Sequence, residues 1–126
     1  MPIGTARILH HQQVHYFRKR VNYNDAGIAA GVFVGTLPAG AMLLMLAVRV
    51  NTAFNAGTTN ALKAGTTATG TELFTDAATA GARFPTVPNL SFATDTDFYV
   101  SYAQTGTAAS AGQADIVITY APNNDQ

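Results

Sequence analysis

Residues 97–102 read Asp-Phe-Tyr-Val-Ser-Tyr, and residues 114–120 read Ala-Asp-Ile-Val-Ile-Thr-Tyr. Both runs are rich in aromatic and β-branched residues, which are the side chains that favour β-strands. The chain between them is a loop of Gly, Thr, Ala and Ser, which form turns readily. We therefore predict two strands here, joined as an antiparallel hairpin with a long tip.

The rest of the chain alternates in the same way between short apolar runs and small polar turns. Residues 5–21 are expected to form an extended arm that leads into a first strand. Further strands are expected at residues 31–35, 41–52, 60–65, 71–75 and 87–92. About eight short strands separated by turns predict an all-β fold, a jelly roll or two-sheet antiparallel sandwich with an extended N-terminal arm.

The composition is that of a small domain with little charge. The chain has 126 residues, a mass of 13.2 kDa, no cysteine, 11% charged residues and a formal net charge of zero. A chain of this length buries roughly two-thirds of its unfolded surface, so it can form a core without disulfides. We expect one domain, with the arm and first strand at residues 1–24, the sandwich at 25–122 and a frayed tail at 123–126. The small net charge favours an assembled state.

Charges are unevenly distributed along the chain. Arginine and lysine dominate residues 1–50, whereas aspartate and glutamate dominate the remainder. The two halves are expected to meet within the fold or across a subunit interface, or else to be scattered and solvated.

Residues 26–48 contain no charge and admit two interpretations. The stretch is long enough for a membrane helix, since about 20 apolar residues span a bilayer. Several glycines and Pro38 interrupt it, which favours two buried strands joined by a turn at residues 36–40. Within the second strand, the run Met-Leu-Leu-Met-Leu at residues 42–46 predicts burial on both faces or coverage by a neighbouring subunit.

Residues suited to catalysis or metal binding are sparse. On a strand, His11 and His15 would lie roughly 13 Å apart, and no carboxylate completes a site with them and His10. Asp95 and Asp97 lack the remaining ligands of a calcium loop and are expected to cap a turn. No nucleophile elbow, phosphate loop or dinucleotide fingerprint is present in the sequence. We therefore predict that the protein is not an enzyme and uses no cofactor or metal.

The most basic segment is Arg18-Lys19-Arg20, which follows Tyr16 and Phe17. Basic and aromatic side chains in such an arrangement can bind single-stranded nucleic acid. The neutral composition opposes that function, because nucleic-acid-binding domains are usually clearly basic. We expect the segment to bind an acidic protein surface instead.

Four motifs follow one another in a characteristic order and spacing. They are Leu-Pro-Ala-Gly-Ala at residues 37–41, Thr-Ala-Phe-Asn-Ala-Gly-Thr at 52–58, Asp-Thr-Asp-Phe-Tyr-Val at 95–100 and Thr-Gly-Thr-Ala-Ala-Ser-Ala-Gly at 105–112, and Pro-Asn follows at 122–123. Over roughly residues 30–123 the chain resembles a family of small structural proteins of tailed bacteriophages. Its best-understood members are head decoration proteins, also called capsid cement proteins.

This resemblance implies a jelly-roll protein on the outer surface of the mature capsid. The implied partners are the major capsid protein and further copies of the chain, with a trimer favoured, and no nucleic acid or membrane. Such a protein is made in the host cytoplasm and becomes part of the virion. It clamps neighbouring capsid subunits and stabilises the shell.

Three groups of residues are candidates for contacts. We assign capsid contact to the segment around the basic cluster and expect that replacing its three cations by Ala weakens capsid binding and leaves folding intact. The second group is assigned to the core or to an oligomer interface, and the third to contacts of a loop tip. The groups are Tyr16, Phe17, Arg18, Lys19 and Arg20; Met42, Leu44 and Leu46; and Gln104, Thr105 and Thr107.

An alternative function is that of a tail- or vertex-associated adhesin that binds host-surface glycans. An adhesin of this fold would use the loop at residues 104–112. Glycan sites commonly combine an exposed aromatic ring with Asp or Asn, and Tyr102 with Asp97 is the candidate pair for that role.

Overall fold

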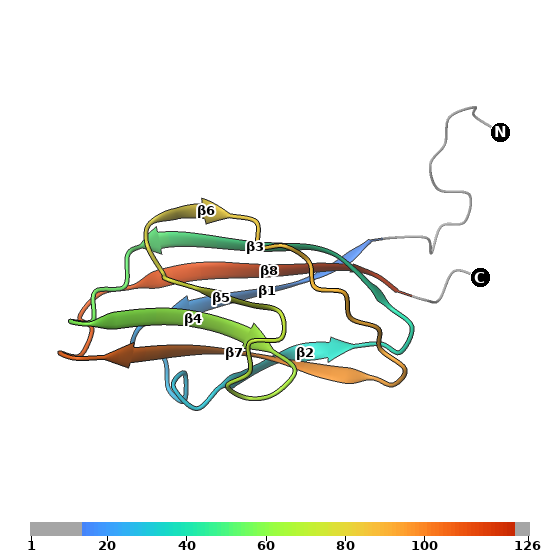
Figure 1. Cartoon of the computed structure of the whole chain (residues 1–126), viewed down its shortest axis with the longest axis horizontal. Helices are drawn as coiled ribbons and strands as arrows, with labels where there is room; N and C mark the ends of the chain where they lie inside the picture. Colours follow the sequence, from blue (N-terminus) through green and yellow to red (C-terminus); the bar gives the residue numbers. More distant parts are fainter. Residues whose placement is uncertain (1–13, 123–126) are drawn as a thin grey trace.

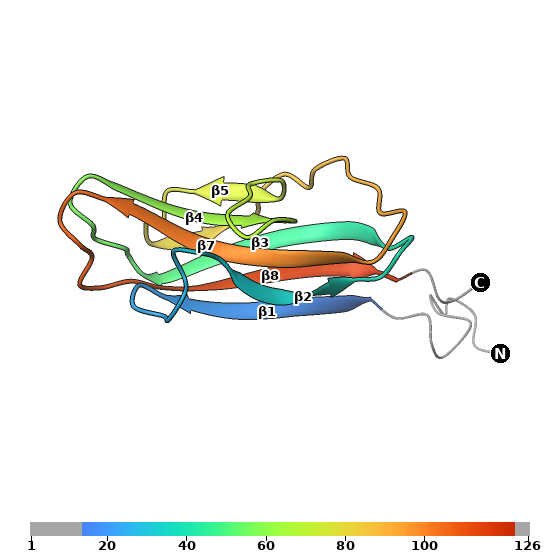
Figure 2. The same ribbon diagram turned by 90° about the horizontal axis from the view of Figure 1, so that it is seen from below.

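The computed structural model describes residues 14–122, which form eight strands and contain no helix. The strands are β1 (His15–Asn22), β2 (Val32–Leu37), β3 (Met42–Thr52), β4 (Thr59–Gly65), β5 (Phe74–Asp76), β6 (Gly81–Arg83), β7 (Thr96–Thr105) and β8 (Gln113–Ala121). Figure 1 and Figure 2 show two stacked layers of strands. The sheets have the orders β1-β8-β3-β6 and β2-β7-β4-β5, and all the pairs are antiparallel. The chain passes from one sheet to the other at every connection except β4 to β5, so the predicted jelly-roll sandwich is confirmed.

The predicted hairpin between residues 97–102 and 114–120 is wrong. β7 pairs with β2 and β4, whereas β8 pairs with β1 and β3, so the two strands lie in different sheets. Each is a central strand that buries alternate side chains, Phe98 and Val100 from β7 and Ile116 and Ile118 from β8. The alternation in the sequence reports which face of a strand is buried. It does not report which strand lies beside it.

The apolar run at the start of β3 is buried on one face only. Leu43 and Leu46 belong to the core, whereas Met42, Leu44 and Met45 are exposed. The pairing with β8 shifts register between Leu43 and Met45, so Leu44 is an extra residue in a β-bulge. The bulge explains why two buried residues are three positions apart and why two consecutive residues both face outward. Burial on both faces, one of the two predicted alternatives, is therefore wrong.

The short strands differ most from expectation. β5 overlaps the end of the strand expected at residues 71–75, and β6 was not predicted. The strand expected at residues 87–92 does not form, and Pro88 in this segment has no amide hydrogen to donate to a ladder. Residues 84–95 instead cross from β6 to β7 along the side of the sandwich and insert Phe92 into the core (Figure 1).

An ion pair joins the two sheets at this side of the sandwich. Arg83 of β6 donates from Nε to Asp76 Oδ2 at 2.6 Å and from Nη2 to Asp76 Oδ1 at 2.7 Å. Burial of Asp76 raises the pKa of its carboxyl, but hydrogen bonds from Arg83 and from the Ala78 amide more than offset this, so the pKa lies below its usual range. The same carboxylate holds the turn at Ala78, whose φ is +60°.

Residues 26–48 fold as a loop followed by β2 and β3, as favoured over a membrane helix. Over residues 14–122 there is no helix long and apolar enough to cross a membrane. The expected arm at residues 1–13 and the expected tail at 123–126 lie outside the described residues.

Candidate interaction surface

The outer face of the sheet β1-β8-β3 carries a row of exposed apolar side chains. In the register of the sheet, Tyr16 of β1 and Met45 of β3 both lie opposite Thr119 of the central strand β8. Tyr16 is 67% exposed and Met42 65% exposed, which is unusual for side chains of this size. Val14, Leu44 and Met45 are exposed as well. Together these five residues, Val14, Tyr16, Met42, Leu44 and Met45, form what we call the apolar half of the outer face.

The same face becomes basic further along the strands. Arg20 and Arg49 both lie opposite Asp115 of β8, and Arg18 lies two residues before Arg20 on β1. Arg18 Nη2 contacts Asp115 Oδ2 at 3.2 Å, and Arg20 Nε contacts Asp115 Oδ1 at 3.0 Å. Asn51 donates a further hydrogen bond to Asp115 Oδ2 at 3.2 Å. We call Arg18, Arg20, Arg49 and Asp115 the basic half of the outer face.

The electrostatics of the basic half are set by one buried carboxylate. The Asp115 side chain is only 7% exposed, whereas those of Arg18 and Arg20 are more than half exposed. The Arg20 hydrogen bonds, aided by Asn51 and Arg18, outweigh burial and lower the pKa of Asp115 to about 2. The basic end of the sequence therefore meets the acidic end within the fold. Because three guanidinium groups face one carboxylate, this half of the face keeps a positive charge.

The five residues assigned to capsid contact do not form one surface. Tyr16, Arg18 and Arg20 face outward, whereas Phe17 and Lys19 point to the other side of β1 and are partly buried. The Phe17 ring stacks on Tyr120 at a centroid distance of 5.1 Å and is partly packed against the core. Phe17 also fills the space beside β2 that is left open because Gly35 has no side chain. Phe17 is thus part of the fold, and β1 is an integral strand along its length.

The three residues assigned to a core or an oligomer interface are likewise divided. Leu46 is fully buried, whereas Met42 and Leu44 belong to the apolar half of the outer face. Sequence reasoning missed Val14 as a member of this surface and included Met45 only within the run at residues 42–46. The signal for Val14 was the alternation of β1, since it lies two residues before Tyr16, but the bulge that turns Met45 outward leaves no local signature.

The loop at residues 106–112 is held against the loop that follows β3. The Gly57 amide donates to Thr107 O at 2.8 Å, and the Ala111 amide donates to Asn55 Oδ1 at 3.0 Å. Beside the loop, Thr105 Oγ1 of β7 lies 2.6 Å from Thr59 Oγ1 of β4. Gln104 accepts a hydrogen bond from the Ala109 amide at 2.7 Å. All three predicted loop-tip residues are exposed, but only Thr107 lies in the loop, because Gln104 and Thr105 are the last two residues of β7.

The candidate glycan pair is wrong. Tyr102 is 1% exposed and its hydroxyl donates to Asn60 Oδ1, so its ring cannot stack on a sugar. Asp97 lies on the opposite face of β7 and accepts a hydrogen bond from Thr36 at 2.8 Å. Asp95 accepts a hydrogen bond from the Ala39 amide at 2.9 Å, so it caps the turn between β2 and β3.

Residues for metal chemistry are not assembled in the described part of the chain. Among residues 14–122, no three His, Cys, Asp or Glu side chains lie close enough together to hold a metal ion. His15 lies beside Tyr120 with a centroid distance of 5.7 Å. The other two members of the histidine cluster, His10 and His11, lie outside the described residues.

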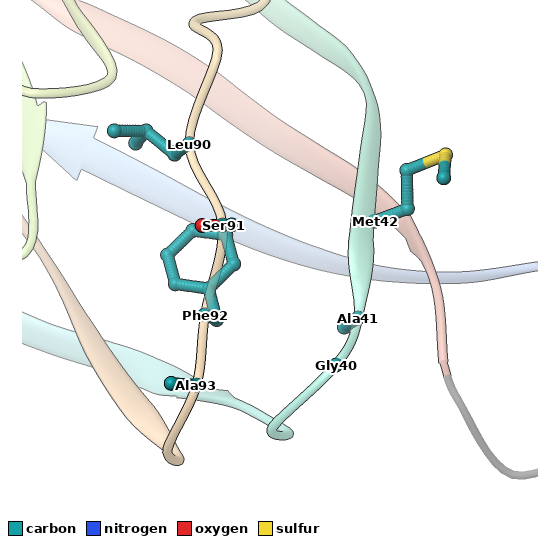
Figure 3. Close-up of a pocket in the computed structure, with 7 residues that line it drawn as sticks. All are labelled: Gly40, Ala41, Met42, Leu90, Ser91, Phe92 and Ala93. Atoms are coloured by element: carbon teal, nitrogen blue, oxygen red, sulfur yellow. The ribbon is translucent and has the colours of Figure 1, made fainter.

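A shallow groove borders the apolar half of the outer face. Its volume is about 460 Å³, and it lies between the start of β3 and the crossing segment at residues 84–95. Figure 3 shows Gly40, Ala41 and Met42 on one side and Leu90 to Ala93 on the other. The lining contains no charged residue, so the groove suits an apolar occupant.

Two solved structures contain a chain with the same sandwich fold. A chain in the capsid asymmetric unit of cyanophage Pam1 is similar over 97% of both chains, with a TM-score of 0.65 and 20% sequence identity. A chain in the acid-stable capsid of Helicobacter pylori bacteriophage KHP30 is similar over 86% of both chains, with a TM-score of 0.62 and 13% identity. This chain has their fold. No protein-family model and no curated protein sequence matches it.

Proposed function

We propose that this protein is a structural component of a tailed-bacteriophage virion that binds the outer surface of the capsid and stabilises the mature shell. The observation that carries the proposal is the outer face of β1-β8-β3, on which an apolar half and a basic half adjoin. It is supported by the fold shared over nearly the full chain with a chain of a phage capsid. The motifs at residues 37–41, 52–58, 95–100 and 105–112 support the decoration role.

The partner that fits this face is the major capsid protein, through a region with apolar and acidic side chains. Burial of Tyr16 and Met45 supplies the affinity, at about 25 cal/mol per Å² of apolar surface. The exposed guanidinium groups of Arg18, Arg20 and Arg49 select acidic partners and orient the encounter. Asp115 fixes two of these groups, which lowers the entropy that they lose on binding.

Repetition on the capsid lattice strengthens each weak contact. A shell presents many identical sites, so copies that associate with one another bind several of them together. Binding to the mature shell alone stabilises that shell by mass action. The protein is made in the host cytoplasm and resides on the outer surface of the virion.

Reconstitution on capsids that lack the protein tests this function. Purified wild-type protein is added to such capsids, and the bound fraction is measured after sedimentation of the particles. We expect Tyr16→Ser to reduce the bound fraction. The matched control is Phe33→Ser, which replaces another exposed aromatic residue, 53% exposed on β2 of the other sheet. Equal binding by the wild type and Tyr16→Ser would remove the outer face from the account, and no binding by the wild type would refute the capsid function.

A further inference from the structure

Half of β3 is an open sheet edge. β3 pairs with β8 over its full length but with β6 only from Val48 to Val50, so Met42–Ala47 has a neighbour on one side. Among the described residues, the crossing segment bonds to the start of this region only where the Gly40 amide donates to Phe92 O at 2.8 Å. The backbone groups of Met42–Ala47 on this side are therefore available for strand pairing.

The other sheet edges carry features that discourage such pairing. β1 bears Arg18, Lys19 and Arg20 in a row, and β2 shifts register between Phe33 and Gly35. β5 and β6 are three residues each, and β4 is open only at Thr59–Ala61 and Gly65, outside its pairing with β5. Cationic, bulged and very short edges are the usual protection against edge-to-edge association. The open part of β3 contains no charged residue and no proline, although it has its own bulge at Leu44.

The surroundings of this edge are apolar as well. Met42, Leu44 and Met45 are at least 40% exposed along it. Phe84, 70% exposed, follows β6 where the pairing with β3 stops, and Leu90 borders the groove at the other end. Five of the exposed large hydrophobic side chains thus surround one uncharged edge.

We propose that a second copy of this chain pairs its own Met42–Ala47 edge with this one, antiparallel and about a two-fold axis. Identical edges satisfy each other only in this arrangement, which is the isologous interface of a two-fold dimer. Charge favours it here, because an axis near Leu44 and Met45 brings no like charges together and leaves the two Arg49 side chains at opposite ends. Pairing of two β1 edges would instead oppose their cationic rows.

The pair joins the two sheets β1-β8-β3-β6 into one and sets two outer faces side by side. Each pair then presents two copies of the surface proposed to bind the capsid, although the pairing itself does not depend on the capsid. The trimer favoured from the family resemblance would be replaced by a pair.

Two lysine substitutions at register partners test the edge. Met45→Lys puts two ammonium groups close to the proposed axis, whereas Thr119→Lys puts the same charge on the same face but on the central strand β8. The free protein is followed by sedimentation velocity over a concentration series, and far-ultraviolet circular dichroism establishes that each variant is folded. We expect a dimer for the wild type and for Thr119→Lys. For Met45→Lys we expect a dissociation constant raised by roughly tenfold or more.

Hydrogen exchange supplies an independent measurement on the wild type. The amides of residues 42–47 are expected to gain protection as the protein concentration rises. A wild type that stays monomeric or forms a trimer would overturn the proposal. Equal weakening by both lysines would assign the contact to the sheet face instead of its edge. An unchanged oligomeric state of Met45→Lys would overturn the proposal whether or not capsid binding is lost, because Met45 also belongs to the outer face proposed to bind the capsid.

Discussion

Arg20 donates two hydrogen bonds to Asp115, from Nε to Oδ1 at 3.0 Å and from Nη2 to Oδ2 at 3.2 Å. The pair joins the first strand to the last across 95 positions of sequence. Arg18 shares the same carboxylate. The expectation that all three cations of residues 18–20 can be replaced without affecting the fold is therefore at odds with the structure. Their removal would leave Asp115 buried without its arginine hydrogen bonds and with Asn51 as its remaining side-chain donor.

Stability is expected to fall in acid through Asp115. Its folded-state pKa of about 2 lies below the ordinary value of 3.8, so the unfolded chain binds the proton more readily. The stabilisation is therefore fully present above about pH 4 and is lost as the pH falls toward 2. We expect about 1–2 kcal/mol from this group, because its arginine partners are half exposed to solvent. Urea unfolding of the wild type and of Asp115→Asn at pH 6, 4 and 2.5 measures it.

The difference between the wild type and Asp115→Asn should shrink in that acid window. A difference that stays constant from pH 6 to 2.5 would show that the ion pair does not couple protonation to folding. Asp97→Asn is the control, since this carboxylate is exposed and accepts one hydrogen bond from Thr36.

Phe17 and Tyr16 are neighbours in sequence with opposite roles. Phe17→Ala removes a ring that packs on Tyr120 and Gly35, and we expect a loss of about 2 kcal/mol in the free energy of unfolding. Tyr16→Ala removes an exposed ring and is expected to change it by less than about 0.5 kcal/mol. Chemical denaturation measures both, and the reverse order of the two effects would contradict the assignment of Phe17 to the fold.

Position 31 requires glycine for two reasons, its left-handed backbone conformation and the close approach of Ala68. Its φ is +103°, and a Cβ there would lie 1.9 Å from the carbonyl oxygen of Ala68. Gly27 has a φ of +75° but open space around it, so Gly27→Ala isolates the cost of the left-handed backbone, about 1 kcal/mol. We expect Gly31→Ala to cost about 2 kcal/mol more than that control. Equal losses of stability for Gly31→Ala and Gly27→Ala in thermal unfolding would mean that residues 66–70 shift at little cost to make room for the added Cβ.

The ion pair between Asp76 and Arg83 is expected to hold the two sheets together. Arg83→Met leaves a carboxylate whose side chain is 8% exposed without its main partner, and we expect a loss of about 2–4 kcal/mol. Asp76→Asn combined with Arg83→Met should recover part of that loss, because no buried charge remains. A double-mutant cycle by urea denaturation measures the coupling, and strict additivity of the two losses would argue against a direct interaction.

Much of the architecture follows from local patterns in the sequence. The alternation in residues 97–102 and 114–120 identified β7 and β8, and the turn at residues 36–40 separated β2 from β3. The partners of these strands were not predictable, since apolar alternation fixes the buried face and leaves the neighbour open. β6 was missed because three residues with one glycine have no detectable period.

The candidate surface was predicted in pieces. The sequence pointed to Tyr16, Arg18 and Arg20 and to Met42 and Leu44 as separate groups with separate roles. The structure brings them onto one face because β8 lies between β1 and β3. The period of two along β1 was sufficient to set Phe17 and Lys19 apart from their neighbours, whereas the bulge at Leu44 depends on the pairing with β8 and has no sequence signature.

The capsid function is tested most directly by the copy number of the protein in purified virions, measured by quantitative mass spectrometry against the major capsid protein. A decoration protein bound throughout the lattice predicts a ratio near one to one. A few copies per particle would place it at the tail or a vertex and favour the adhesin function, and its absence from virions would contradict the account.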